Sequence, residues 1–547
     1  MQSLRTFILG LLLLGGSALG HASIPSSVAV SADSSSHCVE IAVLSINDFH
    51  GNFIGNAYKG IPGAAALCAT LDSLRERYPL HLTVSAGDNF GGSYFHKATK
   101  GSLLPYFFNE AGIRLSAIGN HEFDDGLETL PLKWKDSPLY PQGWDINYVC
   151  ANLRRGDTGQ QPEGIEPVHF CRLPIGNGRE VTVAFVGLLT SAAPYQASAR
   201  RVKGYSFDGR YEVVLDSLLA TNVGEQVRKA PLRILLTHIG SGMRQGQPVW
   251  DDPDSLALSR IDSPLWHGIL SSHTHQRVCG YINERRYPIV QGLCYGTHIS
   301  ALICTLDTSR MEVVKVTPQL ISVTPKATYN ARQRRLQALI DSLQQHTTIA
   351  GHPLNERLAF FDHTLRHSRA HDQEQTEVGS LVTEAYAAAY REATGANETE
   401  VVIGCSHFGS IRTNLPKGDV TVLDVGEALP FSNALRCYSL TGEQLVRLAD
   451  EGCHNVAFGR IQLSRTRPVL NEKEYVVALD YILPDGTQLR LQPQEKYILV
   501  ADEYMTTGGD GYDKALFPAA QELEVSGMPT TTDAFIRYLQ HLPSAPH

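Results

Sequence analysis

The sequence has no long basic run, and its 547 residues carry a formal net charge of −9. Binding to a nucleic-acid polymer through charge is therefore not expected. Beyond one short apolar stretch near the N-terminus, no segment offers the ~20 apolar residues that a membrane span needs. No internal repeat is visible either. A chain of this length is too long for one ordinary core, so we expect two large domains.

The N-terminus has the pattern of an export signal. Arg5 supplies a positive charge, residues 7–14 form a short apolar core, and small residues suit cleavage after Ala22. The alternative is a membrane anchor, which the shortness of the apolar stretch disfavours. We therefore predict a signal peptide over residues 1–22, a disordered Ser-rich lead-in over 23–38, and a periplasmic or secreted protein.

The chain contains ten cysteines, an even number that permits disulfides in an exported protein. Cys279 with Cys294, and Cys150 with Cys171, are candidate local pairs. The sequence leaves the pairing and the oligomeric state open.

Short apolar runs alternate with helical patterns from residue 41 onward, which predicts a layered α/β sheet. One helical pattern covers residues 64–77. The predicted strands cover residues 41–46, 81–86, 115–119, 181–188, 233–236 and 268–271.

A charged amphipathic pattern over residues 326–350 predicts a linker helix between two domains, 39–325 and 351–547. The second domain opens with a predicted helix over 378–393 and a predicted strand over 401–404. These alternating elements again favour an α/β fold.

Nearly every predicted strand of the first domain ends in a polar cluster. Sites in α/β sheets form at the carboxyl ends of strands, so this clustering predicts one shared site. The donors are oxygen and imidazole nitrogen without a thiolate, which suits Zn²⁺ or Mn²⁺ better than a Cys-rich structural zinc site. Each residue alone could be a turn, a helix cap or a buried histidine, but chance does not explain the joint pattern. The candidate ligands are Asp48, His50, Asp88, Asn120, His238, His273 and His275.

The charge of such a site explains its chemistry. Two divalent ions with two aspartates and one hydroxide would retain roughly one positive charge, which attracts a phosphate ester and stabilises charge that develops on its oxygens. The ions would also lower the pKa of bound water, so that a hydroxide nucleophile exists near neutral pH. The predicted cofactor is a pair of divalent ions, Zn²⁺ or Mn²⁺.

The polar clusters form motifs that resemble those of the calcineurin-like metallophosphoesterases. The longer motifs GNHEFD and TTGGDGY narrow the resemblance to the 5′-nucleotidase family, and it covers residues 40–540. The resemblance implies an N-terminal four-layer αββα metallophosphoesterase domain, a linker helix, and a C-terminal α/β substrate-binding domain. The motifs are NDFHG at 47–51, GDN at 87–89, GNHEFD at 119–124, TH at 237–238, HTH at 273–275 and TTGGDGY at 506–512.

The resemblance also implies roles for the first domain's residues. His121 would lie beside the phosphate, stabilise the transition state and assist the leaving group, while Asp124 would orient His121. The alternative for His121 is a structural histidine. One ion would take Asp48, His50, Asp88 and His275, and the other would take Asp88, Asn120, His238 and His273.

In the second domain the resemblance concerns substrate recognition. Phe431 and Tyr504 would sandwich a nucleobase, because aromatic rings stack on any base. Asn433 would hydrogen-bond the base edge, and Asp510 would bind ribose hydroxyls. Arg412 would contact the phosphate through its guanidinium group. The alternatives are core aromatics, a Gly-rich turn and a surface arginine. Domain closure would bring the nucleoside site to the metal site.

Five segments depart from the family pattern, and two of them are Pro62-Gly63-Ala64 and residues 291–301 with His298. Ser271-Ser272 stand where two glycines are common, and a serine carries a Cβ that a glycine lacks. CSHFG at 405–409 replaces an Asn-Gly-Gly segment before Arg412. Residues 372–375 stand where an arginine is common, and Arg366 and Arg369 are nearby but shifted.

The leading hypothesis is a 5′-nucleotidase-like enzyme that hydrolyses extracellular or periplasmic nucleotides to nucleoside and phosphate. One alternative is the same chemistry on cyclic nucleotides, nucleotide sugars or another phosphoester. Another is a non-catalytic binding protein on the same scaffold.

Overall fold

The computed structural model describes residues 37–542 apart from 58, 136, 198, 262, 283–286, 368–374, 408, 455–460 and 518–520. The predicted signal peptide and all but the end of the predicted lead-in lie outside the described residues, as do Arg369 and residues 372–374. The lead-in was predicted to reach residue 38, but Cys38 already begins strand β1. The chain forms two compact units that divide after Ile340, and the second also includes residues 91–98 and 195–200.

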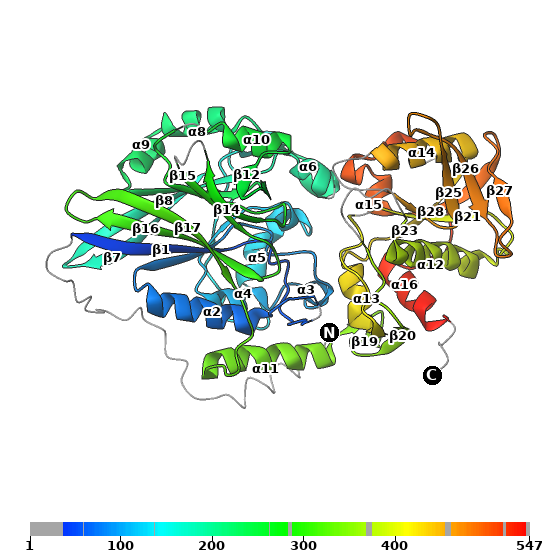
Figure 1. The fold of residues 1–547 in the computed structure, drawn as a ribbon, viewed down its shortest axis with the longest axis horizontal. Helices are drawn as coiled ribbons and strands as arrows, with labels where there is room; N and C mark the ends of the chain where they lie inside the picture. Colours follow the sequence, from blue (N-terminus) through cyan, green and yellow to red (C-terminus); the bar gives the residue numbers. More distant parts are fainter. Residues whose placement is uncertain are drawn as a thin grey trace. The chain divides into compact units, whose positions relative to one another are not determined.

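Two β-sheets form the centre of the first unit (Figure 1). One has the order β17 (Glu312–Ser322), β16 (His298–Asp307), β1 (Cys38–Ile46), β2 (His81–Ser85), β3 (Leu115–Ala117), β4 (Asn147–Val149) and β6 (Ile165–Glu166). The other has the order β14 (Arg277–Ile282), β15 (Tyr287–Gly292), β13 (Gly268–Leu270), β10 (Leu232–His238), β8 (Arg179–Leu189) and β7 (Val168–Gly176).

The sheets pack face to face through a shared apolar core. Val43 and Val84 of the first sheet join Phe185 and Ile234 of the second in one buried cluster. Helices α2 (Ala64–Arg77) and α4 (Leu104–Ala111) cover the outer face of one sheet, and α8 (Tyr211–Leu219), α9 (Asn222–Lys229) and α10 (Pro253–Ser259) cover the other (Figure 1). The predicted four-layer αββα architecture is therefore confirmed.

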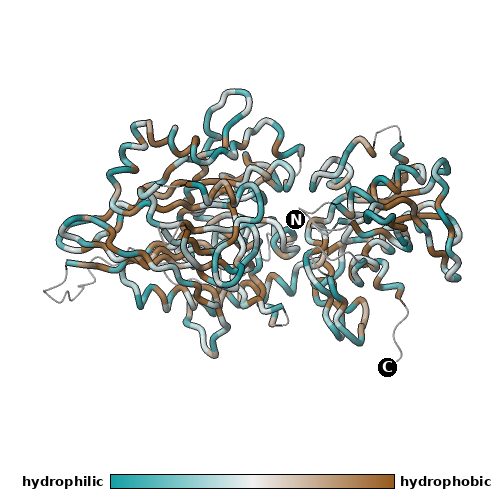
Figure 2. Tube along the Cα trace, turned by 45° about the horizontal axis from the view of Figure 1, so that its top comes forward, coloured by the Kyte–Doolittle hydropathy of each residue, from teal (hydrophilic) through white to brown (hydrophobic). Residues whose placement is uncertain are grey.

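All six strands predicted for this unit are present, with ends that move by up to three residues. The helix predicted over 64–77 is α2 with the same bounds. Figure 2 shows why the patterns were informative: hydrophobic segments follow the strands inside each unit, whereas exposed turns and helix faces are hydrophilic. A run buried on both sides must be apolar throughout, which makes it visible in sequence.

The predicted linker helix is shorter than expected, since α11 covers Ala331–His346. Asn330 caps its start, because its side chain accepts from the Gln333 backbone N–H while the Gln333 side chain accepts from the Asn330 N–H. Beyond the helix, β18 (Thr348–Ile349) pairs with β19 (His352–Pro353). The predicted boundaries of the linker and the domains stay a prediction.

The second unit contains the five-stranded sheet β24 (Gln462–Leu463), β21 (Val402–Ser406), β28 (Lys496–Asp502), β23 (Leu435–Thr441) and β29 (Glu522–Leu523). The same unit contains a three-stranded sheet of β25 (Thr466–Leu470), β26 (Val476–Ile482) and β27 (Gln488–Arg490). It also contains a two-stranded sheet of β20 (Arg357–Phe361) and β22 (Gly418–Thr421). Its helices are α12 (Glu377–Thr394), α13 (Val422–Ala428), α14 (Gly442–His454), the short α15 (Glu503–Thr506) and α16 (Thr531–Gln540). The helix and strand predicted at its start correspond to α12 and β21.

The two candidate disulfide pairs do not form in the structure, because Cys150, Cys171 and Cys279 are free thiols. Cys150 follows β4 of the first sheet, whereas Cys171 lies in β7 of the second. Cys279 lies in β14 opposite Val290 of β15, and Cys294 lies beyond the end of β15. No helix in the described part of the chain is both long and apolar enough to cross a bilayer.

Candidate functional site

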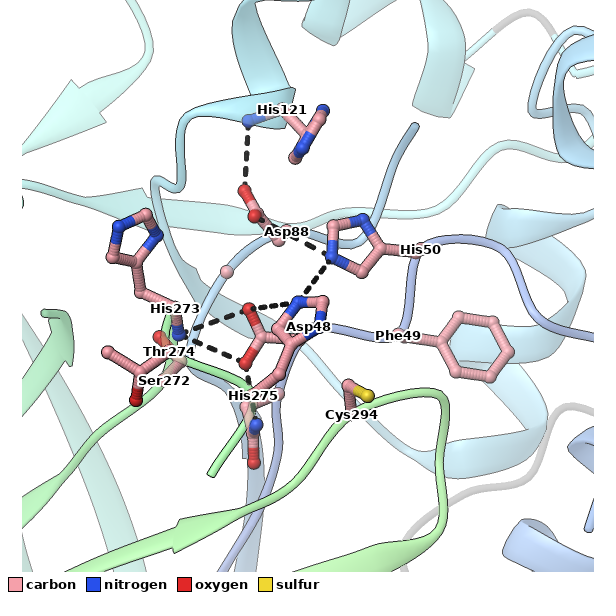
Figure 3. Close-up of polar contacts among 12 residues, drawn as sticks. Asp48, Phe49, His50, Asp88, His121, Ser272, His273, Thr274, His275 and Cys294 are labelled. Carbon is pink, nitrogen blue, oxygen red and sulfur yellow. Dashed lines mark hydrogen bonds and ion pairs between the residues drawn. The ribbon is translucent and has the colours of Figure 1, made fainter. Parts of the chain in front are cut away.

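The candidate ligands meet because their strands end at the same edges of the two sheets. Strands β1, β2 and β3 are parallel neighbours, as are β10 and β13. The loops that follow β1, β2, β3 and β13 carry most of the side chains labelled in Figure 3. The parallel order of the strands thus converts five separate motifs into one location. Asp48 and His50 follow β1, Asp88 follows β2, Asn120 follows β3, His238 ends β10, and His273 and His275 follow β13.

Three groups of side chains have the spacing of metal ligands, with ligand atoms within 4.8 Å of one another in each group. Asp88 belongs to two of the groups and His50 to two, so the groups are contiguous. Asn120 is 4% exposed, and its Oδ1 has no hydrogen-bond partner. The three groups are Asp48–His50–His275, His50–Asp88–His121 and Asp88–His238–His273.

The orientation of the imidazoles fits bound cations. His238 Nδ1 lies 2.9 Å from the carbonyl oxygen of Ala86, which can only accept, so Nδ1 carries a proton and Nε2 is the atom that would bind a metal. That Nε2 faces Asp88 Oδ2 at 3.1 Å. The Nε2 atoms of His50 and His275 face each other at 3.0 Å (Figure 3). A proton can join these close ligand atoms, and a divalent ion can take its place, so this set of imidazole and carboxylate groups fits divalent ions.

The pKa values of the candidate ligands show that the buried carboxylate of Asp88 is stabilised by nearby positive charge. Burial raises the pKa of Asp48 to about 7. Burial also tends to raise the pKa of Asp88, but the charges of His238 and His121 hold that pKa well below its usual range. Burial opposes a charge on His238, yet Asp88 raises its pKa to about 9. Burial and the charge of His238 lower the pKa of His273 to about 3. A proton on His238 therefore occupies a place that suits a divalent ion.

The backbone at the ligands is strained. Residues other than glycine rarely adopt a positive φ, because the Cβ then crowds the backbone. Five of the candidate ligands have a positive φ, which ranges from 47° at Asp48 to 82° at His273. Strain of this kind persists only where surrounding structure enforces it, and it collects at functional sites. The candidate ligands with a positive φ are Asp48, His50, Asp88, His273 and His275.

Two glycines allow the loops to approach each other. A Cβ at Gly119 would lie 2.2 Å from Asp88 Oδ1, and a Cβ at Gly87 would lie 2.8 Å from His238 Nδ1. Neither position could accept a side chain without moving a candidate ligand. The glycines of the GDN and GNHEFD motifs are therefore steric requirements of the site.

His121 and Asp124 form a close pair, with Nδ1 of the ring 2.9 Å from Asp124 Oδ2. The His121 backbone N–H donates to Asp88 Oδ1 at 2.9 Å, which fixes the residue next to a candidate ligand (Figure 3). The geometry therefore permits two roles for His121, a proton donor oriented by Asp124 or a third member of the group with His50.

Glu122 belongs to the GNHEFD motif, but the sequence assigns it no role. Its carboxylate is fully buried and accepts from the backbone N–H groups of Asp88, Asn89 and Gly119 at 3.0, 2.9 and 2.7 Å. It thereby joins the loops that carry Asp88 and Asn120.

Glu122→Gln should lower the free energy of unfolding by about 2–4 kcal/mol, because an amide NH₂ would face backbone donors in a buried place. We also expect a 10- to 100-fold loss of metal affinity, since the loops would lose their common acceptor. Urea denaturation and metal titration measure the two effects. Exposed Glu128→Gln is the matched control; equal behaviour of both variants would contradict the role of Glu122.

The serines that replace the family's glycines add hydrogen bonds. Ser272 is fully buried and donates towards the carbonyls of Ala86 and Thr237, at 2.7 and 3.0 Å, while its Oγ lies 2.8 Å from His238 Nδ1. Ser271 Oγ donates to the Ile239 carbonyl at 2.6 Å. The two serines therefore still allow this loop to lie close to β10 and to Ala86, and the Ser272 hydroxyl fixes the orientation of the His238 ring.

In the second unit, four of the five predicted substrate residues contact one another in two pairs. The guanidinium carbon of Arg412 lies 5.3 Å from the centre of the Phe431 ring. Tyr504 donates its hydroxyl to Asp510 Oδ1 at 2.9 Å. Asn433 donates to Asp502 Oδ1 at 3.5 Å, so its amide already has a partner within the protein.

Family comparison covers most of the chain. Residues 41–277 match the calcineurin-like phosphoesterase family, and residues 355–517 match the 5′-nucleotidase C-terminal domain. The chain belongs to the 5′-nucleotidase family of metallophosphoesterases. Members of this family are metal-dependent phosphoester hydrolases, and the three His/Asp groups of this chain lie in the metallophosphoesterase domain.

Individual relatives are distant. The endonuclease YhcR of Bacillus subtilis (strain 168) is 26% identical over 495 residues, which are 86% of this chain and 37% of YhcR. The 5′-nucleotidase of Vibrio vulnificus is 23% identical over 517 residues, 87% of this chain and 86% of that protein. The crystal structure of a 5′-nucleotidase precursor from Thermus thermophilus has a TM-score of 0.73 at 20% identity and covers 93% of this chain and 97% of that one. The chain thus spans little more than a third of YhcR, and the structural likeness shows the fold.

Proposed function

We propose that the protein is an exported phosphoesterase with two divalent ions, Zn²⁺ or Mn²⁺, that hydrolyses extracellular or periplasmic nucleotides to nucleoside and phosphate. The observation that carries this proposal is the convergence of imidazole and carboxylate ligand atoms at the strand ends, where His50 Nε2 lies 3.0 Å from His275 Nε2 and His238 Nε2 lies 3.1 Å from Asp88 Oδ2. The N-terminal sequence pattern supports export.

The ions, when bound, would supply positive charge to the phosphate and lower the pKa of a coordinated water. Asp88 is central to the ligand set, because its carboxylate lies between His50 and His238, at 3.8 and 3.1 Å. Asp48 and His275 would complete one coordination shell, and Asn120 and His273 the other.

His121 would act on the leaving group. Asp124 accepts from its Nδ1, which leaves Nε2 as the atom that would hold a proton for the departing oxygen. In the second domain, Arg412 would bind the phosphate, and Phe431 and Tyr504 would hold the base between their rings. Asp510 would bind the ribose, and Asn433 the base edge.

The second candidate function is the same hydrolysis on another phosphoester, such as a cyclic nucleotide or a nucleotide sugar. The changed segment before Arg412 favours it, because His407 occupies a place beside Asp510. Asn433 also has a partner in Asp502, which weakens its assignment to a base edge.

Phosphate release from a panel of nucleotides, with and without Zn²⁺ or Mn²⁺, tests the proposal. Activity that needs no metal, or none on any nucleotide, would count against it. A nucleotide sugar or cyclic nucleotide as the preferred substrate would support the second candidate.

Phe431→Ala should raise KM for the preferred nucleotide about five- to 100-fold, because one stacked ring contributes about 1–3 kcal/mol. Hydrolysis of p-nitrophenyl phosphate, which has no base, should be unaffected. Phe360→Ala is the matched control, since Phe360 also lies under an arginine, Arg357, at 5.9 Å in the same unit. An unchanged KM for every nucleotide would exclude base stacking on Phe431.

A further inference from the structure

His407 is a buried histidine that neither the metal site nor the predicted substrate residues include. It follows directly after β21 and begins the loop that leads to Arg412. It lies in the segment that departs from the family's Asn-Gly-Gly pattern. It is 3% exposed, so its ring is part of the interior of the second unit.

The ring of His407 is held by contacts on several sides. Its Nδ1 lies 2.6 Å from Asp510 Oδ2. Its face stacks on Tyr504, with ring centres 5.5 Å apart and planes inclined by 27°. Tyr512 lies edge-on at 6.4 Å. Because Tyr504 donates to Asp510 Oδ1, the two carboxylate oxygens contact two different side chains that are stacked on each other.

The charges around His407 favour its protonated form. Burial opposes a charge on the ring, but Asp510 and, more weakly, Asp502 raise its pKa, while Arg412 opposes them. Asp502 Oδ2 lies 3.9 Å from His407 Nε2. A protonated His407 therefore balances a carboxylate that would otherwise be costly to bury.

The loops around this pair leave little freedom. A Cβ at Gly409 would lie 2.6 Å from Asp510 Oδ2 and 2.9 Å from the His407 ring, and a Cβ at Gly509 would lie 2.4 Å from the Tyr504 ring. Asp510 itself has a φ of 52°, a strained value for an aspartate. Both loops thus support one defined position of the carboxylate.

We propose that His407 is a positioning residue that determines substrate specificity, because together with Tyr504 it holds the Asp510 carboxylate in the orientation that binds the hydroxyls of a ribose ring. This inference rests on the proposed nucleotide substrate. A site whose carboxylate is fixed in advance loses affinity when the ligand lacks the hydroxyls or when the carboxylate can rotate.

The test compares adenosine 5′-monophosphate, its 2′,3′-dideoxy analogue and p-nitrophenyl phosphate as substrates of the full, metal-reconstituted chain. Wild type should have a KM for the ribonucleotide about tenfold below that for the dideoxy analogue. His407→Ala should remove this difference by raising the ribonucleotide KM, with kcat and the p-nitrophenyl phosphate reaction unchanged. His407→Asn, which keeps a donor near the position of Nδ1, should restore part of the preference.

Two further variants separate positioning from a general structural effect. His454→Ala is the matched control, because His454 also stacks on a tyrosine of the second unit, Tyr475, at 5.0 Å. It should behave as wild type. The double variant His407→Ala/Asp510→Ala should be no worse than Asp510→Ala alone, since both changes remove one interaction. Should His407→Ala not fold, His407→Asn and its double variant with Asp510→Ala carry the same comparison.

The outcomes distinguish this inference from the proposed function. A wild-type enzyme that cleaves nucleotides and prefers the ribose form, with a preference that survives in both His407 variants, overturns the inference alone. A wild-type enzyme that cleaves p-nitrophenyl phosphate but no nucleotide, or that ignores the ribose hydroxyls, overturns the ribose assignment and the inference together.

Discussion

His121→Gln should lower kcat for a nucleotide about 10²- to 10⁴-fold, the range expected when an oriented proton donor is lost. Nδ1 of His121 is held by Asp124 at 2.9 Å, which directs the other ring nitrogen away from that carboxylate. The effect should be much smaller for p-nitrophenyl phosphate, because its leaving group needs little protonation. Asp124→Asn should show a weaker loss with the same dependence on the leaving group.

Metal content decides between the two roles that the geometry permits for His121. The His121→Gln protein should keep its ions, since the resemblance implies that His121 is not a ligand. His169→Ala is the control, because His169 forms a pair with Glu166 at the same sequence spacing as His121 with Asp124. An ion lost together with the activity would make His121 a ligand, in the group with His50 and Asp88.

Asp88→Asn should reduce kcat/KM by at least about 10³-fold, and it should reduce bound metal as well. The change preserves size but removes the negative charge that two of the three ligand groups share. Metal analysis and phosphate release on the same preparation measure both effects. Glu110→Gln is the control, because Glu110 is a buried acid that pairs with Arg332 at 3.2 Å outside the metal groups. Full metal content and activity in Asp88→Asn would contradict a shared carboxylate.

The convergence of the candidate metal ligands could be predicted because it depends on a regular feature of the fold. Buried strands produce apolar runs in the sequence, and parallel strands end at the same edge of a sheet. The sequence therefore predicted that Asp48, Asp88 and His238 lie close together. The bounds of α2 followed from its apolar and charged pattern. The end of the linker helix did not, because the strand β18 that follows it depends on pairing with β19 rather than on local sequence.

The residues that support the ligands could not be predicted in the same way. The role of Glu122 depends on three backbone N–H groups from two loops, and backbone donors leave no trace in the sequence. Ser272 appeared only as a departure from a glycine, although its hydroxyl contacts His238. His407 was visible as a change of residue type, but its ion pair with Asp510 joins segments that are about a hundred positions apart.

Paired cations at the ends of the strands are central to the proposed chemistry, and their number per chain is the most direct test. The purified protein, saturated with Zn²⁺ or Mn²⁺ and then freed of excess metal, can be examined by inductively coupled plasma mass spectrometry. We expect two ions per folded chain, and fewer than two after Asp88→Asn. No bound ion in the folded wild-type chain, or an equal content in Asp88→Asn, would contradict the paired site.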